Sequence, residues 1–279
     1  MLNSTSTFTR SSTIFLFTTL ILLTGCTRIA RLFESFNARG YDRDIRRATQ
    51  SIAASQNNAQ RSSAYADRAD AYSEKARYSR LMKLISDDQY NQLFNSALDD
   101  YNQALALSPD SAALYYRRGN AYYSRASLDM IYKPTSPSLA PAKADFTRAV
   151  QMDPKNRMAL DMLGLTDGSM GDWTAALADF EKETALDPKF NFRVSDAYCN
   201  RGSRYPKDKS DLAISDLNHA IEMRTNSDPC ECEPYNPLLA IYLYQTHQYN
   251  KARDLVALAQ RSHKWIDPQF LAQLNSSPH

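Results

Sequence analysis

Histidine and cysteine are the side chains in this sequence that could supply acid–base, nucleophilic or metal chemistry. The four histidines fall in separate stretches of the chain, at His219, His247, His263 and His279. None of the motifs HExxH, GxSxG, GxxxxGKS and GxGxxG occurs, so the usual metal-protease, hydrolase and nucleotide-binding signatures are missing. We therefore expect no enzyme activity, no cofactor and no metal site.

Cys26 is a cysteine whose neighbours point to a specific covalent chemistry. A polar segment with one basic residue, Arg10, leads into the apolar run at residues 14–23, which is too short to span a ~30 Å hydrocarbon core and suits a signal peptide. The run ends in Leu23-Thr24-Gly25-Cys26, an apolar residue, two small residues and a cysteine. This ending resembles the lipobox of bacterial lipoproteins.

The lipobox resemblance implies that residues 1–25 are a lipoprotein signal peptide and that Cys26 carries the acyl chains. Two or three acyl chains anchor a protein stably. Thr27 follows the cysteine, and in Gram-negative lipoproteins a residue other than Asp at this place implies the outer membrane. We expect a lipid-anchored protein of the outer membrane that faces the periplasm. The alternative is an ordinary signal peptide or an uncleaved anchor with a chance cysteine.

The composition indicates a helical protein. The 279 residues include only 7 glycines and three valines, whereas nucleotide-binding folds need glycine-rich turns and strands favour β-branched residues. A hydrophobic content of 43% is enough for a sizeable core. The formal net charge of +2 gives no basic footprint for nucleic acid.

The sequence contains an internal repeat, and its predicted helices must position any functional site. A small residue, an aromatic residue or leucine, and a second small residue recur at i, i+4 and i+7, which is one face of a helix. The four copies begin at Ala97, Ala142, Ala176 and Ala213. The preceding pattern, Tyr-x-x-Arg-Gly/Ala-x-x-Tyr, begins at Tyr65, Tyr115 and Tyr198, with a degenerate copy at Leu160. Proline follows three of the second helices, at Pro109, Pro154 and Pro188.

This order of residues resembles the tetratricopeptide repeat (TPR), a helix–turn–helix unit of about 34 residues. In repeat 3 Glu183 replaces the second small residue. The resemblance covers residues 63–264 and implies an all-α solenoid of about 4–5 helical hairpins, with a weaker fifth unit at about 233–264. Residues 26–62 are predicted to form a linker and a leading helix or decayed repeat, and residues 265–279 a capping helix and tail.

Repeats 1 and 2 carry insertions between their two helices. The first, of 16 residues around 81–94, could extend the helices, whereas the second, of 11 residues around 133–141, is a proline-rich loop that cannot be helical throughout. Both insertions lie on the same edge of the predicted solenoid. They indicate either a binding edge or neutral loop drift.

The TPR resemblance also implies a role for the remaining cysteines. Neighbouring first helices of a TPR stack run parallel, which would place Cys199 close to Cys230 and Cys232. In an oxidising periplasm we predict a disulfide from Cys199 to Cys230 or Cys232, with one thiol left over. A three-thiolate metal site is the alternative, although structural zinc normally takes four ligands.

Arginine and aspartate recur at fixed places in the repeats. The arginines are Arg68, Arg118 and Arg201, and the aspartates are Asp100, Asp145, Asp179 and Asp216. We predict a structural ion pair between the two helices of repeats 1, 2 and 4, and none in repeat 3, where Leu163 replaces the arginine. Pairing with the following repeat is the alternative.

In TPR proteins the first helices line a concave groove, and exposed Tyr and Arg are common interface anchors. The family pattern maps a candidate protein-binding groove onto Tyr116, Arg117, Asn120, Tyr123, Asp161, Met162, Asn200, Ser203 and Tyr244. The alternative is that the tyrosines only pack the superhelix. Asn120 matches one residue of the carboxylate clamp of chaperone-binding TPRs, but the lysines of that clamp are missing, so we do not expect capture of a peptide C-terminus.

The combined resemblances imply a lipid-anchored periplasmic scaffold or adaptor that mediates protein–protein interactions in the bacterial cell envelope. Its expected partners are envelope proteins, together with the membrane through the acyl chains, and not nucleic acid. The alternative is a dedicated accessory or assembly subunit of an outer-membrane, pilus or secretion complex.

Overall fold

The computed structural model describes residues 27–131, 135–223, 235–261 and 265–278, with side chains from Gly40 onward and, in the helix that begins at Tyr235, from Leu239. Within these ranges the secondary structure consists of twelve α-helices and two short 3-10 helices, without a strand. This confirms the predicted all-α fold class. The chain divides into two compact units after Leu128.

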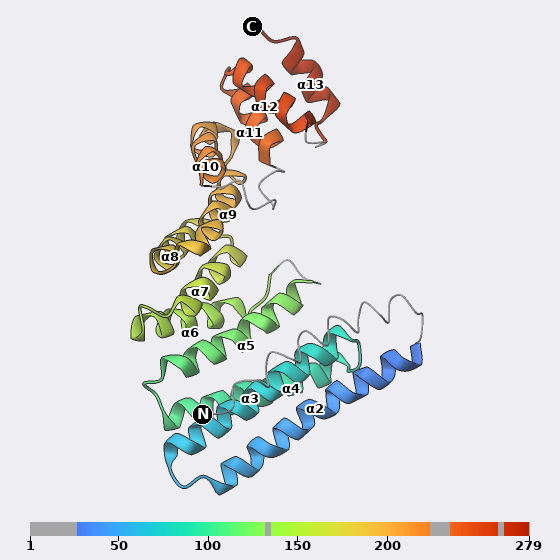
Figure 1. The fold of residues 1–279 in the computed structure, drawn as a ribbon, viewed down its shortest axis with the longest axis vertical. Coiled ribbons are helices and arrows are strands. Elements are labelled where there is room, and N and C mark those ends of the chain that lie inside the picture. The colour runs from blue at the N-terminus through green and yellow to red at the C-terminus, as the bar shows by residue number, and fades with distance from the viewer. Residues whose placement is uncertain (1–26, 132–134, 224–234, 262–264, 279) are drawn as a thin grey trace. The chain divides into compact units, whose positions relative to one another are not determined.

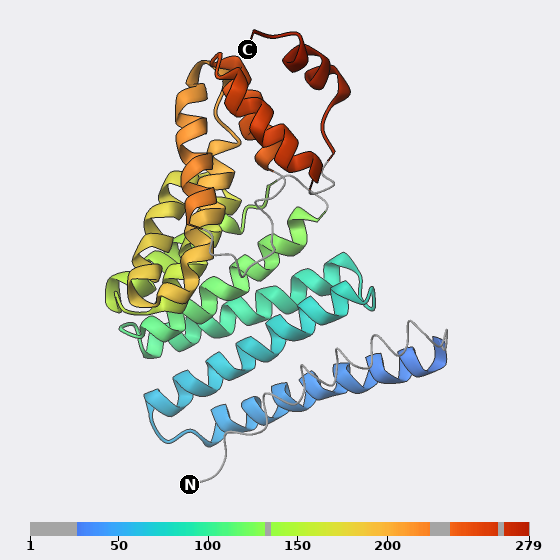
Figure 2. The same ribbon diagram turned by 45° about the horizontal axis from the view of Figure 1, so that its top comes forward.

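The first unit contains α2 (Thr27–Ala54), α3 (Asn58–Leu81), α4 (Asp87–Leu107) and most of α5 (Ala112–Met130). Helix α3 packs against α2 on one side and α4 on the other (Figures 1 and 2). The core of this unit is built from Phe94 and Tyr101 of α4, which pack among the alanines of α3. Helices α3 and α4 are the two helices of predicted repeat 1.

The first insertion lengthens both helices of repeat 1. Helix α3 continues to Leu81 and α4 begins at Asp87, so a short turn is all that separates them. Ser86 starts α4 with a capping box, in which its side chain accepts from the Gln89 amide while the Gln89 side chain accepts from the Ser86 amide. In the second insertion residues 135–138 are not helical, in agreement with its prolines, and α6 begins at Leu139.

The second unit continues with α6 (Leu139–Met152) and then three hairpins, in which each helix packs against the next (Figure 1). The hairpins correspond to predicted repeats 3, 4 and 5. Their helices are α7 (Arg157–Ser169), α8 (Trp173–Leu186), α9 (Asn191–Gly202), α10 (Ser210–Glu222), α11 (Tyr235–Gln245) and α12 (Tyr249–Arg261). The 3-10 helices η1 (Pro188–Phe190) and η2 (Lys207–Lys209) precede α9 and α10.

Helix α13 (Pro268–Asn275) covers the end of the last hairpin. Asp267 caps it by accepting from the Gln269 amide, and Pro268 occupies the first turn, where its missing N–H leaves no hydrogen bond unmade. Phe270 and Leu274 are buried against α11 and α12. The structure therefore confirms a C-terminal capping helix.

Glycine marks a close helix crossing in repeats 3 and 4. A Cβ atom added at Gly164 would lie 2.6 Å from the ring of Phe180 on α8, and one added at Gly202 would lie 3.1 Å from side-chain atoms of α10. Gly171, in the turn between α7 and α8, has a φ of +87°, a backbone conformation that residues other than glycine rarely adopt. These glycines have a geometric reason within the repeat.

The predicted signal peptide and Cys26 lie outside the described residues. Among the helices that the structure describes, none combines the length and the hydrophobicity needed to cross a membrane.

Candidate functional site

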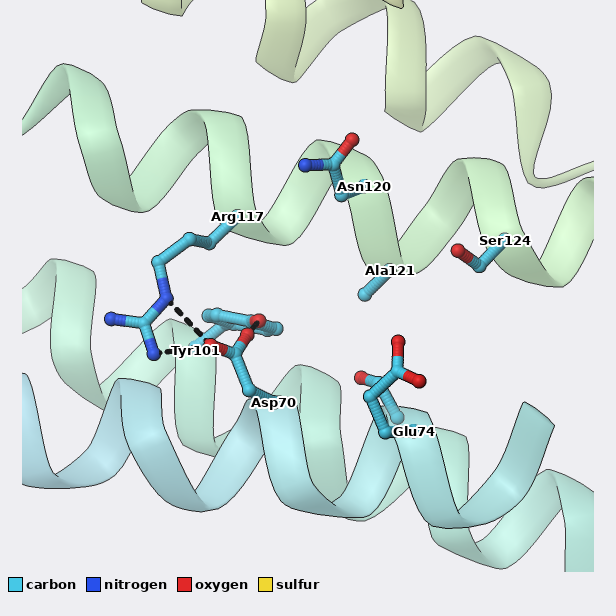
Figure 3. A pocket seen from close by; sticks show the side chains of 8 residues that line it. Asp70, Glu74, Tyr101, Arg117, Asn120, Ala121 and Ser124 are labelled. Carbon is cyan, nitrogen blue, oxygen red and sulfur yellow. Dashed lines mark hydrogen bonds and ion pairs between the residues drawn. The ribbon is translucent and has the colours of Figure 1, made fainter. Parts of the chain in front are cut away.

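A pocket of about 290 Å³ lies between α3 and α5 in the first unit (Figure 3). Helix α3 lines one side, α5 lines the other, and the side chain of Tyr101 reaches in from α4. The lining residues are Asp70, Ser73, Glu74, Tyr101, Arg117, Asn120, Ala121 and Ser124. Because α3 and α5 are the first helices of repeats 1 and 2, this is a position on the groove that the sequence predicts.

One end of the pocket is fixed by a network around Asp70. The Nε atom of Arg117 donates to Oδ2 of Asp70 at 2.9 Å, and a terminal nitrogen of the same guanidinium donates to Asp67 at 2.9 Å. The hydroxyl of Tyr101 donates to the other Asp70 oxygen. Charge-assisted hydrogen bonds of this kind are stronger than neutral ones. The Asp70 carboxylate is therefore held in one orientation between α3 and α5.

Tyr101 and Arg117 both have raised pKa values in this network. Tyr101 is 1% exposed, and burial together with the negative charge of Asp70 raises its pKa, so the phenol stays a donor. Burial alone would lower the pKa of Arg117, but its hydrogen bonds and its attraction to Asp70 raise it overall. The tyrosine proton and the arginine charge are thus constant over the physiological pH range.

The other end of the pocket presents side chains that are open to a ligand. Asn120 and Ser124 of α5 and Glu74 of α3 line this end (Figure 3). Within the described residues neither the Asn120 amide nor the Ser124 hydroxyl is engaged by a protein group. Three acids, Asp67, Asp70 and Glu74, lie in and beside the pocket, and they outnumber the two arginines that pair with them, Arg117 and Arg77, the second of which donates to Glu74 at 2.6 Å. The pocket therefore suits a donor-rich or cationic group better than a carboxylate.

The structure distributes the nine predicted groove residues over several places. Arg117 and Asn120 line the α3–α5 pocket, while Tyr116 and Tyr123 are half-buried on the same helix but do not line it. In the second unit, Asn200 lines a different pocket of about 270 Å³, together with residues of α7 and α8.

The remaining groove predictions fall on packed positions. Asp161 of α7 is ion-paired to Arg193 of α9 at 2.8 Å, and Met162 is half-buried beside it. Ser203 ends α9 as its C-cap. The ring of Tyr244 packs 5.4 Å from that of Tyr249 and 5.6 Å from that of Phe270 on α13, measured between centroids. For Tyr244, packing of the superhelix accounts for its position.

The sequence reasoning missed the acidic half of the pocket, although a signal was present. Tyr65 and Tyr115 are equivalent in the repeat pattern and lie 50 residues apart. The same offset relates Asp67 to Arg117 and Asp70 to Asn120. Extending the groove positions to repeat 1 would have identified both aspartates.

The recurring arginine and aspartate form ion pairs within a repeat. Arg68 holds Asp100 through two hydrogen bonds of 2.7 Å, and Arg201 holds Asp216 through bonds of 2.7 and 2.9 Å. The hydrogen bond to the aspartate is the largest cause of the raised pKa of each arginine. The structure confirms intra-repeat pairing in repeats 1 and 4. In repeat 2 the two residues belong to different units, and their pairing stays a prediction.

Cys199 is buried on α9. Cys230 and Cys232 lie outside the described residues, so the pairing of Cys199 with one of them stays a prediction. Among the described side chains no group of three or more His, Cys, Asp or Glu is arranged to hold a metal ion.

The disulfide prediction is tested by counting thiols. If Cys199 is bridged, the unreduced and unfolded protein with an acylated Cys26 should titrate one thiol per chain, rising to three after reduction, since one bridge consumes two thiols. Titration with a chromogenic thiol reagent in denaturant measures this number. Three thiols before reduction would rule out the disulfide and leave the metal alternative open.

Comparison with protein families identifies one repeat in the chain. Residues 92–124 match the model of the TPR repeat family. These residues span most of α4 and most of α5, and include Tyr101, Arg117 and Asn120 of the pocket. No curated protein sequence matches the chain.

Solved TPR proteins show a remote similarity. The chain is 22% identical to a crystal structure of MamA, with a TM-score of 0.41, over 66% of this chain and 88% of that one. It is 19% identical to YrrB, which is described as a TPR protein with an unusual peptide-binding site. The TM-score is 0.41, over 68% of this chain and 83% of that one. It is 22% identical to the Arabidopsis OM64 TPR domain, with a TM-score of 0.33, over 48% of this chain and 93% of that one. The chain therefore has an all-helical, TPR-like solenoid fold with a recognisable TPR repeat at residues 92–124.

Proposed function

We propose that this chain is a lipid-anchored periplasmic scaffold or adaptor that binds protein partners of the cell envelope through the α3–α5 pocket. TPR proteins mediate protein–protein interactions, and the pocket lies on the first helices of two successive repeats. The observation that carries the proposal is the open half of this pocket, where Asn120 and Ser124 line the cavity without a protein partner among the described residues.

The size and chemistry of the pocket support a peptide segment as its ligand. Its volume of about 290 Å³ is at the low end for small-molecule sites, which run to ~1,000 Å³, and suits one or two side chains of a protein. Asp70 is already oriented by Arg117 and Tyr101, so binding needs little further ordering. A segment that presents an ammonium, amide or hydroxyl donor meets the acceptor Asn120 and the carboxylate of Glu74, which also accepts from Arg77 at its Oε2 atom.

Photocrosslinking in living cells tests the proposed interface. A photoreactive amino acid at Asn120 should capture one or a few defined proteins, identified by mass spectrometry, because this side chain lines the pocket. A second probe at Pro137, which is exposed, tests the edge formed by the insertions. Gln103 is exposed on α4 outside the pocket and serves as the matched control. If Asn120 captures no more protein than Gln103, the α3–α5 pocket is not the binding site.

The lipid anchor is the second part of the proposal and is carried by the Leu23-Thr24-Gly25-Cys26 sequence. Cells that express the chain and are fed an alkyne analogue of palmitate should label it, and the Cys26→Ser variant should lose the label because the acylated thiol is gone. A Cys199→Ser variant controls for other cysteines. Label that persists in Cys26→Ser would contradict the anchor without affecting the proposed pocket.

A further inference from the structure

A second cavity, of about 730 Å³, lies in the second unit where α6, α7 and α8 meet. One end is apolar and includes Leu160 and Leu163 of α7. The other end is charged and includes Asp167 of α7, Asp179 of α8 and Lys143 of α6. This cleft shares no residue with the α3–α5 pocket, so an inference from it does not depend on the function proposed above.

The charged end occupies the place of the arginine–aspartate pair of the other repeats. In repeats 1 and 4 an aspartate of the second helix holds an arginine of the first helix through two hydrogen bonds. Repeat 3 keeps the aspartate, Asp179, but has Leu163 where the arginine belongs. Asp179 is 6% exposed, as buried as Asp100 and Asp216, and it lies in the wall of the cleft. Repeat 3 therefore keeps the carboxylate that binds an arginine in repeats 1 and 4, but it lacks the arginine.

The contact that Asp179 does make is weak. Lys182, three residues further along the same helix, lies 2.8 Å from its carboxylate, but the side chain of Lys182 is 62% exposed. A solvent-exposed lysine gains little from such a pair, so Lys182 can move away into water at small cost. Asp179 thus has a desolvated carboxylate and an easily displaced partner.

A second substitution in repeat 3 widens the cleft and adds another acid. Asp167 stands where Tyr72 and Tyr205 stand in repeats 1 and 4, and a carboxylate is much shorter than a phenol. Asp167 is almost fully buried and is ion-paired to Lys143 of α6 at 2.6 Å. Burial raises the pKa of Asp167 above its ordinary range despite the lysine. The two acids of the cleft are buried, whereas both lysines are partly exposed.

We propose that this cleft binds an arginine side chain of a protein partner, which takes the place of the arginine that repeat 3 lacks. The guanidinium pairs with Asp179 at the charged end, where its planar fork matches a carboxylate. The aliphatic stem lies on Leu160 and Leu163, since long basic side chains bury their methylene groups against apolar surface. A lysine would fit less well, because its ammonium cannot make the two parallel hydrogen bonds.

Titration of the full chain with N-acetyl-arginine amide, followed by residue-resolved NMR, tests the proposal. The amides of α7 and α8 around Leu163 and Asp179 should shift, and should saturate at a concentration roughly tenfold lower than with N-acetyl-lysine amide. Equal responses to the two probes, or shifts confined to other helices, would overturn it.

Two variants make the assignment specific. Asp179→Asn should weaken the binding of the arginine probe by about tenfold, because the paired charge is lost, whereas Asp211→Asn, an exposed acid on α10, should leave it unchanged. Leu163→Arg should abolish binding by supplying the arginine from within the chain. If Leu163→Arg does not fold, Asp179→Asn decides alone, and undiminished binding by that variant overturns the proposal.

Discussion

Replacement of Asp216 by asparagine is expected to lower the free energy of unfolding by about 2–3 kcal/mol. The side chain of Asp216 is 8% exposed and accepts two hydrogen bonds from Arg201, whose own side chain is 22% exposed. Asparagine has an NH2 donor in place of one of the two accepting oxygens, so one hydrogen bond is lost and a partly buried guanidinium loses its charged partner. Urea denaturation followed by circular dichroism measures the change.

The chain contains its own control for this prediction. Asp179→Asn alters the equivalent position of repeat 3, where the partner is the exposed Lys182 and not an arginine. This variant should change the free energy of unfolding by less than about 1 kcal/mol. Similar losses in the two variants would mean that the arginine is not the source of the stability that Asp216 contributes.

Replacement of Gly164 by alanine is expected to lower the free energy of unfolding by about 1–3 kcal/mol. The new Cβ would lie 2.6 Å from the ring of Phe180, which is 2% exposed, so the ring or the helices must shift. The helix propensity of alanine offsets at most about 1 kcal/mol of this loss. Thermal and urea unfolding of the full chain measure the net effect.

Gly40→Ala is the matched control, because no atom lies within 4 Å of its added Cβ and the residue is within α2. Without a clash, the better helix propensity should raise the free energy of unfolding by about 0.5–1 kcal/mol. The two alanine variants should therefore change stability in opposite directions. A Gly164→Ala protein as stable as the wild type would show that α7 and α8 do not need glycine to cross closely.

The repeat pattern predicts the helices well because each one carries a local signal. Small and aromatic residues at helical spacing place Ala97, Tyr101 and Ala104 in the core of the first unit, where the structure finds them. The intra-repeat arginine–aspartate pairs were also predictable, since their partners recur at fixed places in the sequence. Both predictions depend only on the spacing of residues within one repeat.

Glu183 shows where the repeat pattern stops being informative. It replaces a small residue of the pattern and is fully buried. The structure explains it through Arg157, which pairs with Glu183 at 2.7 Å and lies 3.9 Å from the centroid of the Phe190 ring. Burial raises the pKa of Glu183, although Arg157 acts in the opposite direction. The periodicity predicts neither Arg157 nor Phe190 as a neighbour of Glu183, because Arg157 lies at the start of α7 and Phe190 at the end of η1.

Only the α5 side of the candidate site was predicted, because the repeat pattern does not show which side chains of other helices lie beside it. The family pattern identified Arg117 and Asn120 on α5, but the character of the pocket depends on α3, where Asp70 and Glu74 add acidic groups. The orientation of Asp70 depends in turn on the hydroxyl of Tyr101, which the pattern assigns to the core. The chemistry of the pocket emerges only when three helices are placed together.

The affinity of a partner captured from Asn120 tests most directly whether the α3–α5 pocket binds protein. The partner should bind the full chain, and Asn120→Arg should weaken binding by at least about tenfold, because a longer cationic side chain fills the open half of the pocket. Gln103→Arg adds the same charge on α4 outside the pocket and should change the affinity by less than about twofold. Equal affinities for the wild type and Asn120→Arg would contradict a binding site in this pocket.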